Sequence, residues 1–160
     1  MLEITVIAMG KLKEKFYLNA AAEYEKRLSG YAKFRLIELP EVRLSENPSK
    51  GEITAALEKE ADTAMSRLPK GAWLCVLSPE GKLLSSEQLA AELKKQKLNG
   101  KSSLCFFLGS SYGMSPRMKQ QADLLLSMSP MTFPHHLARI MVLEQIYRAE
   151  SIQANSKYHK

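Results

Sequence analysis

The residues most suggestive of a binding site form a short loop, residues 109–115, directly after a run of apolar residues at 104–108. An apolar run without alternation predicts a strand buried on both faces, as in the centre of a parallel sheet. Gly109 and Gly113 permit a tight backbone that side chains resist. In open α/β sheets, ligands bind beyond the carboxyl ends of central strands, so this loop is a candidate ligand site. A plain strand-to-helix turn explains the glycine spacing equally well.

The loop does not match the common phosphate cradles. It lacks the G-x-G-x-x-G spacing of a dinucleotide turn and the G-K-[ST] ending of a P-loop. We therefore do not expect a pyrophosphate or a γ-phosphate to be held there. The chain also has no H-E-x-x-H sequence, which disfavours the common zinc hydrolases. Any reaction at this loop requires little covalent help from the protein.

A second group of residues capable of chemistry lies near the end of the chain. It consists of His135, His136, Arg139, Glu144, Gln145, Arg148, Asn155, Tyr158 and His159. On a helix, Glu144 and Arg148 are i,i+4 partners, and an ordinary ion pair explains them. Adjacent side chains point about 100° apart on a helix, so His135 and His136 are not a ready metal pair. Capping or solvation explains each histidine without a catalytic role.

These candidates lie in a chain of alternating strands and helices. Strands are predicted at residues 2–8, 34–39, 73–77, 104–108 and 124–128. Helices are predicted at about 13–28, 49–68 and 85–97, from 115 onward, and at 135–151. This alternation predicts an α/β fold with a mostly parallel sheet and helices on both faces. The 160 residues fit a single domain, 1–160.

The last predicted helix is apolar around most of its circumference. Its apolar residues are Leu137, Ile140, Met141, Val142, Leu143, Ile146 and Tyr147. Such a helix must be buried on more than one side. With the sheet on one side, we expect a second subunit on the other, and hence a homodimer.

Composition limits the function classes further. The net charge of +6 favours a polyanionic partner such as RNA, although the excess is modest. No apolar run approaches the roughly 20 residues that span a bilayer, and the N-terminus does not resemble a signal peptide. We therefore expect a cytoplasmic protein that does not enter a membrane. Cys75 and Cys105 have no redox or zinc spacing and are expected to be buried.

Several motifs, taken in order, resemble one known family. They are residues 8–11 (Ala-Met-Gly-Lys), 81–86 (Gly-Lys-Leu-Leu-Ser-Ser), 107–113 (Phe-Leu-Gly-Ser-Ser-Tyr-Gly), 131–135 (Met-Thr-Phe-Pro-His), Arg139, 144–149 (Glu-Gln-Ile-Tyr-Arg-Ala) and the ending Tyr158-His159. From first residue to last, the chain looks like the ribosomal RNA large subunit methyltransferase H family, a minimal member of the SPOUT class. One departure is Ser110, where the family usually has a second glycine. A serine keeps the turn if its φ is negative.

The resemblance implies a cofactor, a substrate and a fold. Family members use S-adenosylmethionine to methylate N3 of a pseudouridine in large-subunit (23S) ribosomal RNA, within the assembled ribosome. They are homodimers with a C-terminal trefoil knot, and they need no metal. Mapped residue by residue, the cofactor site takes Leu77, Gly109, Gly113, Met128, Ser129, Pro130, Met131, Thr132 and Phe133. By the same mapping, the catalytic residues on the side that faces the RNA are His135, Arg139, Tyr158 and His159.

These residue types suit methyl transfer from a sulfonium, which is a direct displacement governed by alignment. His135 is a candidate base for the N3 proton. Arg139 or the cations of the tail are candidates for stabilising negative charge on the base. Two alternatives stay open: a SPOUT enzyme that acts on another RNA base, and a non-catalytic RNA- or ribosome-binding module. The glycine loop favours catalysis, because a binding module needs no cofactor pocket.

Overall fold

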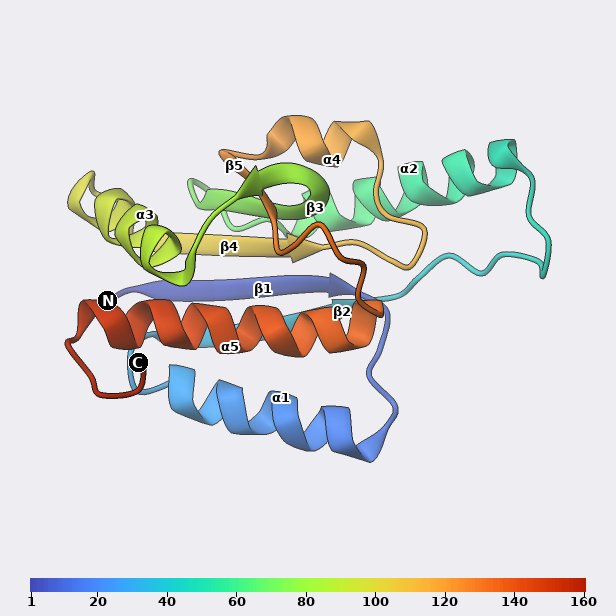
Figure 1. Cartoon of the computed structure of the whole chain (residues 1–160). Coiled ribbons are helices and arrows are strands. Elements are labelled where there is room, and N and C mark those ends of the chain that lie inside the picture. Colours follow the sequence, from blue (N-terminus) through green and yellow to red (C-terminus); the bar gives the residue numbers. More distant parts are fainter.

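The computed structural model describes residues 1–160 and contains one five-stranded sheet in which every pairing is parallel. The strands are β1 (Glu3–Met9), β2 (Lys33–Leu39), β3 (Trp73–Leu83), β4 (Ser103–Leu108) and β5 (Leu124–Ser127), in the order β2-β1-β4-β3-β5 (Figure 1). The helices are α1 (Lys15–Leu28), α2 (Lys50–Arg67), α3 (Ser86–Leu98), α4 (Pro116–Gln121) and α5 (His135–Gln153). The predicted α/β class with a parallel sheet is confirmed.

Helices cover both faces of the sheet, as predicted. On one face, Phe106 of β4 belongs to a buried cluster completed by α1, α3 and α5. On the other face, Phe107 belongs to a cluster completed by α2 and α4. Residues 104–108 are all buried, which confirms β4 as a central strand. The carboxyl ends of β1 and β4 therefore meet at one edge of a rigid sheet.

Local sequence signals fix where the helices begin. Ser49 and Glu52 form a capping box at α2: the Glu52 N–H donates to Ser49 Oγ (3.1 Å), and the Ser49 N–H donates to Glu52 Oε1 (3.2 Å). Ser85 and Gln88 form the same arrangement at α3. Each box satisfies backbone donors that would otherwise lack partners. These starts agree with the prediction.

Strand β3 is longer than predicted. The run Ser-Pro-Glu-Gly at residues 78–81 predicts a stop after Leu77, but the strand continues to Leu83. After Leu77 its register on β5 shifts, and Lys82 then pairs with Leu126. A Cβ on Gly81 would lie 2.6 Å from the Leu126 carbonyl carbon, so glycine permits the close approach. Figure 1 shows β3 curling over β5. The predicted trefoil knot would be threaded in this region and stays a prediction.

The structure corrects two inferences about the helices. Phe16, expected on the buried face of α1, is 65% exposed, because α1 lies at the edge of its layer beside α5. Helix α5 lies between α1 and α3 (Figure 1), so much of its apolar surface is covered within the chain. The breadth of that surface therefore does not by itself require a second subunit. Leu137 of α5 is 38% exposed.

Both cysteines are free and buried, on opposite faces of the sheet. Burial raises the pKa of both thiols, that of Cys105 to about 12. They are therefore inert packing residues. None of the helices has the length and apolar character that a membrane span requires.

Candidate functional site

The main cavity lies at the carboxyl ends of β3, β4 and β5, where an open α/β sheet binds its ligands. We call it the glycine-loop cavity. Its volume is about 760 Å³, and residues 77–80, 108–114 and most of 126–135 line it. Sites for small ligands typically measure about 300–1,000 Å³. Three loops thus enclose a space large enough for a nucleoside cofactor.

The glycine loop has a shape that its two glycines make possible. A Cβ on Gly109 would lie 2.3 Å from the Gly113 carbonyl oxygen, which no real Cβ tolerates. Ser110 and Gly113 exchange backbone hydrogen bonds of 3.1 and 2.9 Å, and Gly113 has a φ of +92°. Ser110 does not have a positive φ, so serine fits where the family usually has glycine. An ordinary strand-to-helix turn does not require the backbone at Gly109 and the Gly113 carbonyl group to lie this close together.

Residues 109–113 of the loop also match the pattern G-x-S-x-G, which is the sequence of the nucleophile elbow in α/β-hydrolases. In that elbow, the serine sits on a sharp, strained turn that leads straight into a helix. Here the next helix begins only at Pro116, and Ser111 has no positive φ. Ser111 is exposed and makes no side-chain hydrogen bond to a histidine. The geometry therefore does not support a serine nucleophile.

The segment after β5 supplies the opposite wall of the cavity. Ser127 Oγ donates to the Ser129 carbonyl oxygen (3.2 Å), and the Met131 N–H donates to Ser129 Oγ (2.9 Å). These bonds hold the segment in a turn. The structure brings together along this one cavity Leu77, Gly109, Gly113, Met128, Ser129, Met131, Thr132 and Phe133. Pro130 lies in the same turn but does not line the cavity.

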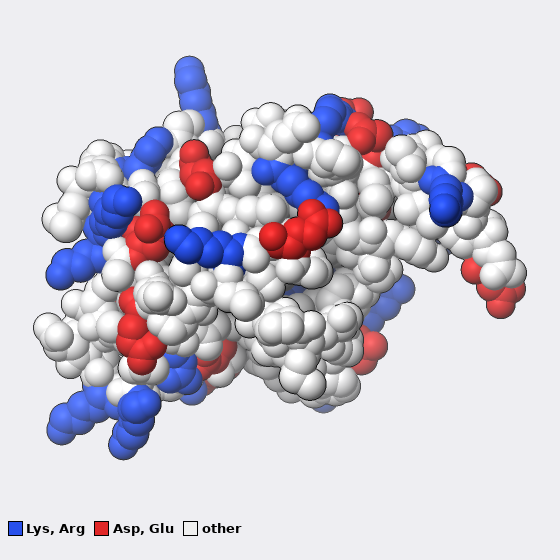
Figure 2. Space-filling view, turned by 45° about the horizontal axis from the view of Figure 1, so that its top comes forward, with Lys and Arg blue, Asp and Glu red and all other residues white.

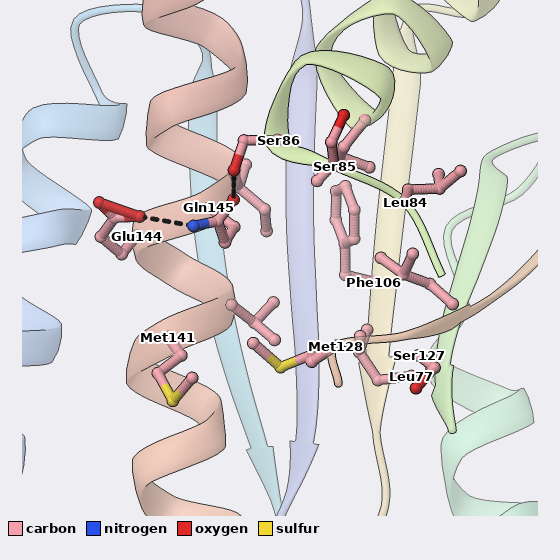
Figure 3. Close-up of a pocket in the computed structure, with 14 residues that line it drawn as sticks. Leu77, Leu84, Ser85, Ser86, Phe106, Ser127, Met128, Met141, Glu144 and Gln145 are labelled. Atoms are coloured by element: carbon pink, nitrogen blue, oxygen red, sulfur yellow. Dashed lines mark hydrogen bonds between the residues drawn. The ribbon is translucent and has the colours of Figure 1, made fainter. Parts of the chain in front are cut away.

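A second cavity lies on the α5 side of this segment, and we call it the α5-side cavity. Its volume is about 400 Å³, and Ser127 and Met128 line both cavities (Figure 3). Within it, Ser86 Oγ donates to Gln145 Oε1 (2.6 Å), and Gln145 Nε2 donates to Glu144 Oε1 (3.0 Å). The walls are mostly apolar. The sequence contains no signal for this cavity, because its walls come from five separate elements, β3, α3, β4, β5 and α5.

His135 lies at the start of α5 and lines the glycine-loop cavity. Its Nε2 is 3.5 Å from Glu41 Oε1, so a carboxylate faces this ring. The neighbouring His136 ring lies 4.1 Å away, centroid to centroid. Burial lowers the pKa of His136, and the charges of His135 and Arg139 lower it further. Only His135 of these two reaches the cavity.

Arg139 lies away from the cavity, at the end of β1. Its side chain is 1% exposed; Nη1 donates to Glu38 Oε2 (2.8 Å), and Nη2 donates to the carbonyl oxygens of Met9 and Gly10 (3.0 Å each). Burial lowers its pKa, while Glu38 opposes that change. Arg139 thus fastens the start of α5 to the edge of the sheet. A lone arginine among apolar helix residues is the sequence signal that could have indicated this.

The tail residues fold back onto α5 and do not line the glycine-loop cavity. Tyr158 donates its hydroxyl hydrogen to Glu144 Oε2 (2.9 Å), and His159 Nδ1 accepts from Arg148 Nη1 (3.0 Å). His159 Nε2 lies 2.6 Å from Glu87 Oε1 of α3. Burial raises the pKa of Tyr158 to about 12, and the bond to Glu144 adds to the rise. The predicted Glu144–Arg148 ion pair is therefore part of a larger cluster.

The basic charge is unevenly distributed. On the face that Figure 2 shows, most Lys and Arg side chains lie at the end of the molecule where the strands begin, and basic and acidic side chains lie together in the middle. The glycine-loop cavity lies at the other end of the sheet.

Comparison with known proteins identifies the class. Residues 2–159 match the family model described as predicted SPOUT methyltransferase. A probable methylase family protein from Haemophilus influenzae Rd KW20 has a similar fold: the TM-score is 0.51 at 14% identity, over 99% of this chain and 70% of that one. SPOUT methyltransferases use S-adenosylmethionine as the methyl donor. The chain belongs to this family, and its resemblance to the ribosomal RNA large subunit methyltransferase H members is confirmed.

Proposed function

We propose that the protein methylates N3 of a pseudouridine in 23S ribosomal RNA, in the assembled cytoplasmic ribosome, with S-adenosylmethionine bound in the glycine-loop cavity. One observation carries this proposal. Of the cofactor positions that the family implies, all except Pro130 line a single cavity of about 760 Å³, although they come from three separate loops.

The residues of the cavity fit the cofactor. The absence of a side chain at Gly109 lets the loop fold back on Gly113, and this compact loop lines the cavity, where it offers main-chain N–H and C=O groups to a ligand. Such groups suit adenine, and apolar Leu77 and Met128 suit its ring faces. At the rim, Lys119 Nζ lies 3.1 Å from Glu80 Oε1, and this pair offers partners for an amino-acid carboxylate and ammonium. When bound, the cofactor supplies an electrophilic methyl group on its sulfonium.

The remaining chemistry is removal of the N3 proton. His135 lines the cavity, and an imidazole has a pKa suited to accepting this proton at neutral pH. Glu41, 3.5 Å from His135 Nε2, would stabilise the imidazolium that forms. Arg139 acts as a positioning residue, because it fixes the first turn of α5 on which His135 stands.

Within their own chain, Tyr158 and His159 are bound to α5 and α3. They can therefore contact the RNA at an active site only if they reach the glycine-loop cavity of a second copy of the chain. A homodimer is therefore part of the proposal. Large apolar side chains are available for the contact: Phe16 is 65% exposed and Leu83 is 56% exposed. Analytical ultracentrifugation at low micromolar concentration should give about twice the monomer mass of 18.0 kDa. A clean monomer would contradict the role of the tail.

Mass spectrometry of ribosomal RNA from a strain that lacks the gene tests the reaction. We expect the loss of one methyl group, on a pseudouridine of the large subunit, and its return on complementation. Loss of a methyl group from another base would favour a SPOUT enzyme of different specificity. No change in any RNA methyl group would favour a binding module.

A further inference from the structure

Cations collect where the strands begin, at the edge of the sheet opposite the glycine-loop cavity. Helix α2 ends at this edge with Arg67, and α3 ends there with Lys95 and Lys97. The loops that lead from these helices into β3 and β4 add Lys70 and Lys101. Figure 2 shows most of the visible Lys and Arg side chains at this end of the molecule. We call five of these cations the basic edge: Arg67, Lys70, Lys94, Lys95 and Lys101.

The two loops of the basic edge are neighbours. Strands β3 and β4 pair in parallel from Trp73 and Leu104, so the residues just before them lie side by side. Lys101 Nζ donates to the Gly71 carbonyl oxygen (3.2 Å), which ties one loop to the other. Gly71 and Gly100 have φ values of +74° and +92°, so both loops turn tightly, and a Cβ at either glycine would meet nothing within 4 Å. The basic edge is therefore one open surface built from two linked loops and two helix ends.

Few carboxylates are available to neutralise this surface. The chain has no Asp or Glu between Asp62 and Glu80, or between Glu92 and Asp123. The carboxylates that lie nearby have other partners: Lys97 donates to Glu150 (2.5 and 2.7 Å), the Leu74 N–H donates to Asp123 (2.8 Å), and Gln96 donates to Glu92 (2.7 Å). Arg67, Lys70, Lys94 and Lys95 are exposed and take part in no ion pair or side-chain hydrogen bond.

The charges on α4, beside the glycine-loop cavity, are arranged differently. There Arg117 pairs with Glu58 (2.5 Å), and Lys119 pairs with Glu80 (3.1 Å). A cation at the end of a helix is stabilised by the helix dipole, which explains Arg67 and Lys95. It does not explain Lys70, which lies beyond the end of α2. Exposed cations without carboxylate partners suit a polyanion.

We propose that the basic edge docks on the phosphate backbone of ribosomal RNA, at a place on the large subunit separate from the target nucleotide. The inference rests on the proposed function, which makes ribosomal RNA the substrate. Phosphate contacts from Lys and Arg supply affinity and orientation without reading sequence. Strand β4 has six residues, and at about 3.3 Å per residue the sheet holds the basic edge roughly 20 Å from the glycine-loop cavity. Docking at this fixed distance orients the cavity toward its target.

A triple variant, Lys70→Gln/Lys94→Gln/Lys95→Gln, tests this surface, because these side chains make no bond within the fold. Co-sedimentation with large subunits over a range of salt concentrations measures the Kd. We expect the Kd to rise at least ten-fold, and the slope of log Kd against log salt to fall by about 2–3, since each lost phosphate contact removes about one. The control, Lys13→Gln/Lys50→Gln/Lys59→Gln, removes the same charge from exposed lysines that each have a glutamate within two residues. The control should bind as wild type does.

A tethered photo-crosslinker identifies the partner. Cys75 and Cys105 are buried, so a thiol reagent should label Lys95→Cys at position 95 alone. We expect cross-links from this position to ribosomal RNA. Cross-links to a ribosomal protein alone would overturn the proposal in favour of an acidic protein partner. A wild-type Kd and salt slope for the basic-edge variant would also overturn it, because the cations would then serve only the helix ends.

Co-sedimentation requires no methyl transfer, so the docking surface and the proposed reaction can fail separately. If wild type transfers no methyl group but the basic-edge variant still loses salt-dependent affinity, the proposed reaction fails and the docking surface stands. If wild type methylates the subunits and the two triple variants have the same Kd, the docking surface fails and the reaction stands. Absence of binding by wild type would overturn the docking surface.

Discussion

Gly109→Ala is the sharpest test of the glycine loop. The added methyl group would lie 2.3 Å from the Gly113 carbonyl oxygen, a backbone atom that cannot rotate away. The loop must therefore open, which weakens the two hydrogen bonds between Ser110 and Gly113. Overpacking of this kind costs about 1–3 kcal/mol. If that cost falls on the shape that binds the cofactor, affinity for S-adenosylmethionine falls roughly 5- to 150-fold.

A thermal melt with added cofactor measures this loss. At a cofactor concentration of about 100 times the wild-type Kd, wild type gains about 2.7 kcal/mol of stability by mass action. A variant with roughly 30-fold weaker binding would gain about 0.9 kcal/mol under the same conditions. Gly51→Ala in the first turn of α2 is the control, because its Cβ meets only Ser49 Oγ at 3.9 Å. Wild-type affinity in Gly109→Ala would refute the assignment of the glycine loop to the cofactor site.

Three further predictions concern α5 and the tail. Arg139→Met should lower the free energy of unfolding by about 3 kcal/mol, because Glu38 and two carbonyl groups lose their buried partner. Urea denaturation measures this free energy, and a decrease below about 1 kcal/mol would contradict the role given to Arg139. A chain that ends at Ser156 should bind S-adenosylmethionine nearly as wild type does, but should methylate ribosomes at least roughly ten-fold more slowly, because stacking on a base is worth about 1–3 kcal/mol. The pKa of His136 is lowered in the folded state, so the unfolded chain binds the proton of this ring more tightly. The free energy of unfolding should therefore fall as the pH drops below about 6.5. In His136→Phe, the free energy of unfolding should depend less on pH in this range.

Much of the fold could be predicted because its signals are local. The apolar run at 104–108 identified the central strand, and the serines that begin α2, α3 and α4 identified those helix starts. The glycine loop could be located for the same reason: it is where the central strand stops. Each of these features depends on residues within one turn or one strand.

The features that could not be predicted depend on distant parts of the chain. Pro79 and Gly81 predict a stop, and only the presence of β5 makes the extension of β3 favourable. The resemblance places Arg139 at the substrate, but in the structure it binds Glu38 and the end of β1; an isolated arginine in an apolar helix indicates that buried partners exist without indicating which they are. Glu60 of α2 is buried and accepts the Val42 N–H, but its sequence context indicates only another surface charge.

Transfer of labelled methyl groups from S-adenosylmethionine to purified large ribosomal subunits tests the central claim most directly. The subunits should come from a strain that lacks this gene, with a parallel set from a strain that also lacks the relevant pseudouridine. We predict incorporation of about one methyl group per subunit in the first set, mapped to N3 of a pseudouridine, and none in the second. Equal incorporation into both sets, or none into either, would contradict the account.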